Sequence, residues 1–265
     1  MAFVWKLLAL LALLPERPYE LWERLVTVAD VRLERCLVPA TFYEAVALED
    51  ALELFAARLG PLVEIGREVA VNETEQRVRQ RLEVINRVSP FDAAHSADID
   101  LARFCYVMTR AMRPQLVLET GVAFGVTSAF ILAALHENGQ GVLHSIDLPP
   151  LARDADRFVG AAIPETLKPR WNLHRGSSRR LLPRILHAVQ AVDIFVHDSL
   201  HTYRNMRWEF DQVWPRLGVG GMIIADDIQG NGAFEELRSR DMEVRAVIRE
   251  HAKGSLFGVV RKRGS

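Results

Sequence analysis

The 265-residue sequence has little of several features that would suggest a function at once. Its two cysteines, Cys36 and Cys105, lack metal-ligand spacing and are too few for a disulfide framework. Its 33 basic and 34 acidic residues nearly cancel, so no excess charge attracts nucleic acid. No apolar run reaches the roughly 20 residues that span a bilayer. We therefore expect a cytoplasmic globular protein with two reduced core thiols and no nucleic-acid partner.

The N-terminus carries the longest apolar run, Leu7 to Leu14, directly after Lys6. This run resembles part of a signal peptide, but it continues into Pro15-Glu16-Arg17-Pro18 without a small-residue cleavage site. We favour a helix that packs against the protein or a second subunit. The alternative is an interfacial anchor or export signal, with weak membrane contact through residues 3–14.

Residues 1–90 read as a helical N-terminal region. Apolar residues recur at helical spacing from Pro18 to Leu37 and from Phe42 to Leu59. The charged segment from Gly66 to Val88 has only a narrow apolar stripe, which favours an exposed helix over a lid or dimer helix. We expect this region to act as a lid or oligomerisation element, and the protein to form a homo-oligomer.

Residues 91–265 alternate strands with helices. Alternation of this kind is typical of an α/β, doubly wound, mostly parallel sheet that helices cover on both faces. Gly254-Ser255 allows an antiparallel hairpin between the last two of seven strands. The expected strands are Leu116–Glu119, Gly141–Asp147, Trp171–Arg175, Val192–His197, Gly221–Asp226, Glu243–Ile248 and Leu256–Arg261. The expected helices are Ala97–Met112, Val126–Glu137, Leu181–Val189, Tyr203–Leu217 and Ala233–Arg240.

A glycine-containing loop follows the first strand of this domain. It has the pattern E-x-G-x-x-x-G, with Glu119, Gly121 and Gly125, instead of the dinucleotide pattern G-x-G-x-x-G. The glycines allow a tight turn and close approach of a ligand. Glu119 disfavours a pyrophosphate and suits the sulfonium and amino groups of S-adenosylmethionine. The loop therefore predicts that cofactor, and we include Ala123, Thr127 and Ser128 in its site.

Two further strand ends extend the predicted cofactor site. Asp147 ends the second strand, about 20 residues beyond the loop, where carboxylates commonly accept ribose hydroxyls. A helix cap is the alternative role for Asp147. After the third strand, Ser177 and Ser178 either bind the adenine edge or cap the next helix.

Acidic residues follow the next two strands. Asp198 comes directly after one, and Asp226-Asp227 ends the other. Adjacent parallel strands would bring these carboxylates to one rim, where they repel one another unless a cation or proton relieves them. Oxygen ligands fit Mg²⁺ better than a softer metal. We predict a magnesium site of Asp198, Asp226 and Asp227, with helix capping as the alternative role for Asp198 and Asp227.

Two histidines flank Asp198. If a helix began at Asp198, His201 would share its face and could act as the general base for a reacting hydroxyl, with a structural histidine as the alternative. His197 would lie on the opposite face of the strand, in a structural position. A non-haem iron site is disfavoured because the spacing is His-Asp-x-x-His rather than His-x-Asp.

The motifs as a set resemble a known family. The runs are VLETGVAFGVTSAFILAAL, HSIDLP, RGSSRRLLP, DIFVHDSLHTYRNMRWEFDQVWPRLGVGGMIIADDI and NGAF. They are similar to class I S-adenosylmethionine-dependent methyltransferases of the methyltransferase domain 24 type. That type is in turn similar to cephalosporin-hydroxylase-like, macrocin and rhamnosyl O-methyltransferases. The resemblance covers roughly residues 90–262 and leaves the N-terminal region unmatched.

The resemblance implies a seven-stranded sheet whose last strand is antiparallel. It also implies that the loop Glu119–Gly125 and Asp147 bind S-adenosylmethionine, that Asp198, Asp226 and Asp227 match magnesium ligands, and that His201 matches a proposed base. Ser177 departs from the family, because many relatives carry an adenine-binding Asp there.

These inferences together predict metal-assisted O-methylation of a small-molecule or sugar hydroxyl, with Asp198 and His201 as the catalytic residues and Asp198 also next to the cofactor. Two rival functions remain. A nicotinamide-dependent oxidoreductase would need G-x-G-x-x-G or a Tyr-x-x-x-Lys pair, but Arg207 stands four positions after Tyr203. A non-catalytic or membrane-associated protein that binds the cofactor would keep the same fold.

Overall fold

A computed structural model describes residues 10, 13–15, 17–37, 41–89 and 98–264 of the chain. The N-terminal segment, residues 3–14, predicted to form a packed helix with weak membrane contact as the alternative, lies mostly outside the described residues. No helix that the structure describes is long and apolar enough to cross a membrane. Cys105 is buried as predicted, whereas the side chain of Cys36 lies outside the described part.

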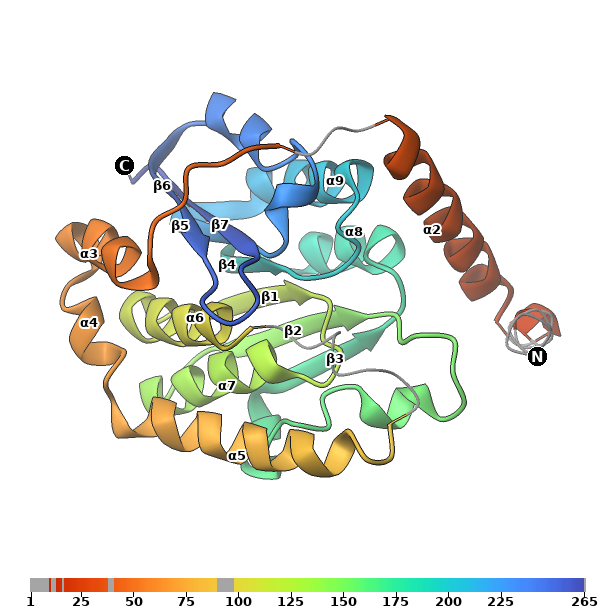
Figure 1. The fold of residues 1–265 in the computed structure, drawn as a ribbon, viewed down its shortest axis with the longest axis horizontal. Coiled ribbons are helices and arrows are strands. Elements are labelled where there is room, and N and C mark those ends of the chain that lie inside the picture. The colour runs from red at the N-terminus through yellow and green to blue at the C-terminus, as the bar shows by residue number, and fades with distance from the viewer. Residues whose placement is uncertain (1–9, 11–12, 16, 38–40, 90–97, 265) are drawn as a thin grey trace.

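A seven-stranded sheet forms the centre of the molecule (Figure 1). Its order is β3-β2-β1-β4-β5-β7-β6, and β7 runs antiparallel to both of its neighbours. The strands are β1 (Leu116–Thr120), β2 (Val142–Asp147), β3 (Trp171–Arg175), β4 (Val192–His197), β5 (Leu217–Ala225), β6 (Met242–Arg249) and β7 (Leu256–Lys262). The predicted doubly wound sheet with an antiparallel last strand is confirmed. The order reverses between β1 and β4, the switch point where such sheets bind ligands.

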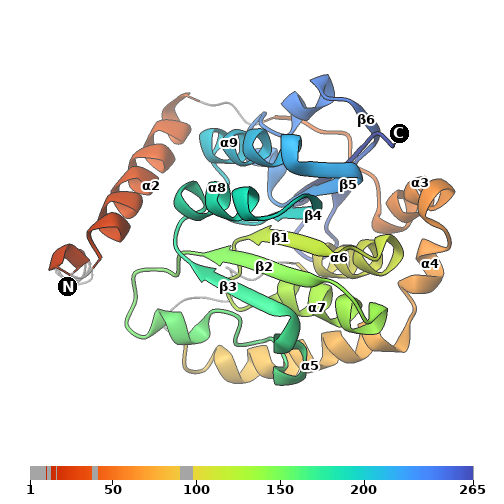
Figure 2. The ribbon, with the colours of Figure 1, turned by 180° about the vertical axis from the view of Figure 1, so that it is seen from behind.

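Two layers of helices cover the sheet (Figures 1 and 2). One apolar cluster packs α6, α7 and the N-terminal helices α3 to α5 on one face, and a second packs α8 and α9 on the other. The helices are α2 (Pro18–Leu37), α3 (Leu48–Leu59), α4 (Leu62–Ile65), α5 (Val69–Ile85), α6 (Ile99–Met112), α7 (Val126–Asn138), α8 (Ser178–Ala188) and α9 (Tyr203–Val213).

Helix α7 explains why the N-terminal region is needed for the core. Its residues from Val126 to Leu135 are all buried, which requires cover on every side. The sheet and α6 supply part of that cover, and α5 supplies more through Val71, Val78 and Ile85, which belong to the same core. The narrow apolar stripe of this charged helix therefore anchors it to the body.

Two predicted helices differ most from the structure, and the predicted helix Tyr203–Leu217 ends earlier, at Val213. Residues 41–47 are extended instead of helical, because Val46 pairs with the open edge of β6: its N–H donates to Val247 O at 2.9 Å and its carbonyl accepts from Arg249 N at 3.0 Å. Edge pairing overrides the helical periodicity there. The predicted helix Ala233–Arg240 is a short 3₁₀ segment, Glu235–Ser239.

Phe104 tests how tightly the N-terminal region is joined to the sheet. The ring of this fully buried residue lies 6.0 Å from that of Phe55 on α3 and 5.4 Å from that of Phe257 on β7. Phe104→Ala should lower the free energy of unfolding by about 3–5 kcal/mol in urea, because it leaves a cavity between three elements. The half-exposed Leu54→Ala on α3 is the control. Equal losses for the two variants would contradict this joint core.

Candidate functional site

The candidate site begins where backbone hydrogen bonds continue beyond the strand ends. Each bond joins the residue after one strand to the neighbouring strand, so the loops leave the sheet in a fixed row. The bonds are Gly176 N to Asp147 O (2.8 Å), Gly121 N to Ile146 O (2.9 Å), Asp198 N to Thr120 O (2.8 Å) and Asp226 N to His197 O (2.8 Å). This row brings the predicted site residues to one rim.

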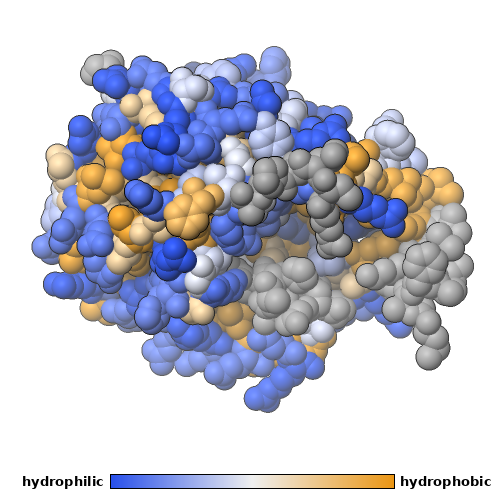
Figure 3. Space-filling view, turned by 45° about the horizontal axis from the view of Figure 1, so that its top comes forward, coloured by the Kyte–Doolittle hydropathy of each residue, from blue (hydrophilic) through white to orange (hydrophobic). Residues whose placement is uncertain are grey.

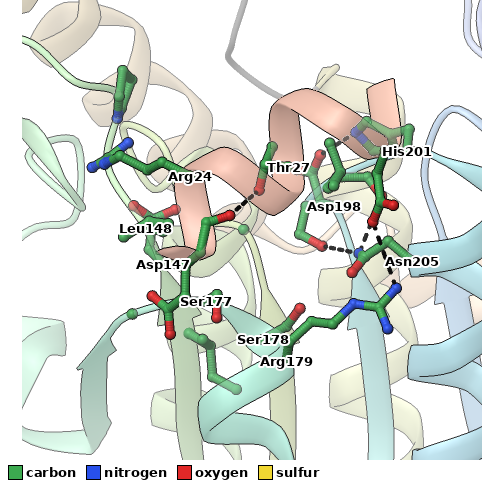
Figure 4. Close-up of a pocket in the computed structure, with 18 of the residues that line it drawn as sticks. Arg24, Thr27, Asp147, Leu148, Ser177, Ser178, Arg179, Asp198, His201 and Asn205 are labelled. Atoms are coloured by element: carbon green, nitrogen blue, oxygen red, sulfur yellow. Dashed lines mark hydrogen bonds and ion pairs between the residues drawn. The ribbon is translucent and has the colours of Figure 1, made fainter. Parts of the chain in front are cut away.

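A pocket of about 760 Å³ opens on this rim (Figure 4). The sequence-predicted residues that line it are Gly121, Ala123, Asp147, Ser177, Ser178, Asp198, His201, Asp226 and Asp227. Four other predicted residues, Glu119, Gly125, Thr127 and Ser128, are not among the described residues of its wall. Glu119 lies near the end of β1, Gly125 ends the loop, and Thr127 and Ser128 are buried in the first turn of α7.

The loop after β1 depends on glycine. Gly121 and Gly125 have φ values of 86° and 84°, and Ala123 between them has a φ of 46°. A Cβ atom at Gly121 would lie 1.7 Å from the carbonyl oxygen of Asp198. The loop therefore reaches its position against the β4 end only because residue 121 has no side chain.

Glu119 differs most from its predicted environment. Its side chain is almost fully buried and accepts hydrogen bonds from Ser128 Oγ and Ser145 Oγ, each at 2.7 Å. Burial raises the pKa of Glu119 to about 7, although these two bonds oppose the shift. Glu119 therefore supports the loop from below and carries only part of a negative charge near neutral pH.

Asp147 faces the pocket and also holds the loop. Its Oδ1 accepts from Val122 N at 3.0 Å, and burial raises its pKa. Ser177 stands at the N-cap position of α8 but makes no side-chain cap bond, and its buried Oγ has no partner in the structure. Of its two predicted roles, the capping bond is therefore absent. A buried hydroxyl without a partner that lines a pocket is free to bind a ligand.

Asp198 and Asp226 lie together after β4 and β5, but the third side chain within reach is His201 and not the predicted Asp227. Asp227 instead accepts a hydrogen bond from Gln229 Nε2 at 3.2 Å. One ligand atom from each of Asp198, Asp226 and His201 lies within 4.8 Å of the other two. Burial and the adjacent Asp226 raise the pKa of Asp198 well above its usual range, and burial raises that of Asp226 to about 6. Asp226 is 6% exposed, and its Oδ1 has no partner among the described residues. Asp198 and Asp226 repel each other when both are ionised, and Lys253, which also lines the pocket, only partly opposes the rise in the pKa of Asp226.

His201 reaches the cluster from a loop. Helix α9 begins only at Tyr203, so the predicted helical face does not exist, yet His201 Nε2 lies 3.7 Å from Asp198 Oδ1 and 4.0 Å from Asp227 Oδ2. Burial lowers the pKa of His201 to about 4. The imidazole is therefore neutral at physiological pH, the form that accepts a proton or binds a metal.

Glu209 holds the loop that carries Asp198 and His201. It is fully buried and accepts from Thr120 Oγ1 at 2.7 Å, Ser199 Oγ at 3.0 Å and Asn205 Nδ2 at 3.0 Å, and its Oε2 lies 2.7 Å from His197 Nδ1. Burial raises the pKa of Glu209, but the charge and hydrogen bond of His197 outweigh it and lower the pKa to about 2.

Two parts of the site were missed at the sequence level. Glu209 had a signal, because an acid on the apolar stripe of α9, beside Met206 and Phe210, must be buried. Helix α2 supplies one wall of the pocket through Trp22, Val26 and Thr27. The sequence predicted a lid or oligomerisation element within residues 1–90, but the helical periodicity of α2 did not indicate which part of the protein it covers.

Comparisons with known proteins agree with this geometry. Residues 118–228 match the methyltransferase domain family named Methyltransf_24. No curated protein sequence matches the chain. Solved structures that the chain is similar to include three O-methyltransferases, one of them putative.

An O-methyltransferase from Bacillus cereus in complex with S-adenosylhomocysteine has a TM-score of 0.56 and 15% identity, covering 81% of this chain and 100% of its own. A second structure is TomG from Streptomyces achromogenes, an O-methyltransferase involved in tomaymycin synthesis, in complex with S-adenosylmethionine. Its TM-score is 0.56 and its identity 16%, and the match covers 81% of this chain and 96% of TomG. A putative O-methyltransferase from Klebsiella pneumoniae has a TM-score of 0.53 and 13% identity, and the match covers 81% of this chain and 97% of the Klebsiella chain. The predicted class I methyltransferase fold is confirmed.

Gly121 and Gly60 form a matched pair that tests the loop. Both have strongly positive φ values, but a Cβ atom at Gly60 would meet nothing within 4 Å. Gly60→Ala should therefore cost only the backbone strain of its conformation, about 1–3 kcal/mol of unfolding free energy. Gly121→Ala should cost clearly more, because the loop or the Asp198 backbone must move. Equal losses in urea unfolding would contradict the close approach of the two loops.

Proposed function

We propose that the protein is an S-adenosylmethionine-dependent O-methyltransferase whose reaction a divalent cation assists. The observation that carries this proposal is that one pocket contains two different sets of polar groups. Asp147 and Ser177 lie on one side, and Asp198, His201 and Asp226 lie on the other. The first set suits a nucleoside, and the second suits activation of a hydroxyl. The family match and the fold support the same conclusion.

The cofactor half fits S-adenosylmethionine. Asp147 is available to the ribose, and the unpartnered Ser177 Oγ is available to the adenine edge. The positive sulfonium would lie near the loop after β1. There it would favour ionisation of Glu119, whose pKa is about 7.

The acidic half fits a hard divalent cation. Asp226 Oδ1 is buried without a partner among the described residues, and burial next to Asp226 raises the pKa of Asp198, so a bound cation would relieve the repulsion between the two carboxylates. Asp198 and Asp226 would hold Mg²⁺, with Asp227 completing the set. A cation bound there supplies Lewis-acid stabilisation to an acceptor oxygen.

The chain's own residues provide the rest of the mechanism. The acceptor hydroxyl loses its proton to neutral His201, and the oxygen takes the methyl group from the sulfonium, leaving S-adenosylhomocysteine. Glu209 fixes the loop that carries His201 and Asp198, so that the base and the oxygen are held together. The acceptor is a small molecule or sugar with a hydroxyl group.

One binding experiment distinguishes the proposed methyltransferase from a non-catalytic binding protein and from an oxidoreductase. Isothermal titration with S-adenosylhomocysteine should give micromolar affinity, and screening with labelled methyl donor should then find a hydroxyl acceptor. Binding without turnover on any acceptor would favour a non-catalytic binding protein. Binding of NADH in place of S-adenosylhomocysteine would contradict the proposal and favour an oxidoreductase.

Ser177→Ala tests the cofactor half without disturbing the fold. The Ser177 hydroxyl makes no hydrogen bond in the structure, so its loss should leave the unfolding free energy unchanged. If it binds the cofactor, affinity for S-adenosylhomocysteine should fall by about 1 kcal/mol, or roughly fivefold. Ser239→Ala on the exposed surface is the control. Unchanged affinity in Ser177→Ala would exclude this contact.

Asp198→Asn and His201→Ala separate the metal from the base. Mn²⁺ serves as a paramagnetic substitute for Mg²⁺, and its binding is measured by the loss of the free-ion resonance. Asp198→Asn should weaken Mn²⁺ binding at least roughly tenfold and leave S-adenosylhomocysteine affinity nearly intact. His201→Ala should keep Mn²⁺ affinity and lose turnover, because a base and not a ligand is removed.

Two results would contradict this assignment. Loss of Mn²⁺ binding in His201→Ala would make His201 a ligand instead of the base. Full turnover of any identified acceptor in EDTA would remove the cation from the mechanism.

A further inference from the structure

Helix α2 lies across the pocket without being packed on the protein core. In Figure 4 it crosses above the site, with Arg24 and Thr27 on the wall opposite Asp147 and Ser177. Neither apolar cluster of the described core contains a residue of α2. Among its described side chains, the two that are buried are Glu20 and Asp30. An amphipathic helix would normally bury its apolar side chains.

The apolar side chains of α2 are instead largely solvated. Tyr19 is 77% exposed, Leu25 48% and Leu33 45%. Figure 3 shows apolar side chains at the surface along this flank of the molecule. Apolar burial therefore does not fix the position of α2 on the body.

Acidic side chains on one face of α2 make the attachment. Glu20, Glu23 and Asp30 follow spacings of three and seven residues, so they point to the same side of the helix. Their partners come from the pocket rim, and Glu34, four residues after Asp30, adds a fourth contact. The contacts are Glu20 with Arg175 at 2.6 Å, Glu23 with Arg180 at 2.6 Å, Asp30 with Arg204 at 2.9 Å and Glu34 Oε1 with Tyr203 N at 2.7 Å.

These partners flank both halves of the site. Arg175 and Arg180 lie on either side of Ser177 in the sequence, and Arg204 lies three residues beyond His201. At the first end of α2, Arg24 Nη2 also donates to the carbonyl of Pro149 at 2.7 Å, just beyond Asp147. The helix thus closes the cofactor half with its first turns and the acidic half with its last turns.

We propose that α2 is a lid on the active site, latched by ion pairs, and that its release admits and discharges cofactor and acceptor. The proposal rests on the proposed function, because it assigns a gate to that same pocket. Ion pairs suit a gate: each contributes little stability when water reaches it, and salt weakens all of them together. A closed lid keeps water from the transferring methyl group, and an open one lets the product leave.

A charge swap at one latch tests the lid. Asp30 and Arg204 are chosen because Arg204 is not among the described residues that line the pocket and lies away from the cofactor half. Asp30 itself lines the pocket and also lies 3.8 Å from Arg179, so Arg204→Asp is the variant that leaves the pocket wall unchanged. Asp30→Arg and Arg204→Asp each bring like charges together, and the double variant restores an opposite pair. Asp241→Arg is the control, since Asp241 pairs with Arg263 at an exposed site outside the lid.

Two measurements are needed. The first is hydrogen exchange of the α2 amides without any ligand. The second is the dissociation rate of S-adenosylhomocysteine by stopped flow. Both should rise roughly tenfold in the single variants and return toward wild type in the double variant, while the control stays unchanged. In the wild type, both should rise between low and high NaCl.

Each contrary outcome has a separate meaning. If α2 exchanges at the same rate in all variants and at all salt concentrations, it belongs to the rigid body and the lid is refuted. If α2 exchange rises but the release rate does not, the helix moves without gating the pocket, which also refutes the lid. If the wild type binds no S-adenosylhomocysteine, the proposed function itself fails. Recovery in the double variant excludes misfolding as the cause of the single-variant effects.

Discussion

The site depends on the row of backbone hydrogen bonds that extends the parallel sheet past its strand ends. Each strand end is tied to its neighbour by one N–H group, from Gly176 through Gly121 and Asp198 to Asp226. Parallel register fixes these pairings, since a slip of one residue would turn every side chain to the other face. The bond from Asp198 N also requires the bare Cα of Gly121 beside it. The position of the loop after β1 therefore depends on both the missing side chain at Gly121 and the register of the sheet.

Two buried acids near these strand ends, Glu209 and Asp226, have opposite pKa shifts. Glu209 is compensated by His197 and several donors, so its pKa is about 2 and it remains an anion. Its contribution to stability is present above the unfolded pKa of about 4.5 and is lost as the pH falls towards 2. Asp226 shows the reverse, because its folded pKa of about 6 lies above the unfolded value and its ionised form opposes folding at neutral pH. One acid is a structural anchor, and the other is arranged for a cation.

The sequence predicted the parts of the site that spacing controls. Asp147, Asp198 and Asp226 each stand directly at a strand end, and strand ends of a parallel sheet meet at one rim whatever the surrounding packing. Glu119 shows the limit of that argument. Its place in the motif was correct, but only the structure shows that Ser128 and Ser145 enclose it and that its charge is partial.

Helix α2 shows a second limit, since apolar periodicity predicts that a helix packs but not against what. Its extent, Pro18–Leu37, matches the pattern, yet acids make the contact and the apolar side chains remain exposed. Periodicity cannot distinguish a helix attached by its acidic side chains from one attached by its apolar side chains, because in both the apolar residues share one face. The partners of the acids lie about 150 to 175 residues away in the sequence, for example Arg175 for Glu20 and Arg204 for Asp30.

Electrostatic attachment of α2 also bears on the chemistry that we propose below it. Methyl transfer from a sulfonium spreads a concentrated charge, so it gains from a site that is dry and of low polarity during the reaction. The arginines at the rim would keep such a pocket polar, but the acids of α2 neutralise Arg175, Arg180 and Arg204 when the helix is docked. Docking therefore removes water and surface charge in the same movement. An apolar seal would exclude water equally well but would leave Arg180 and Arg204 without these acidic partners beside the site.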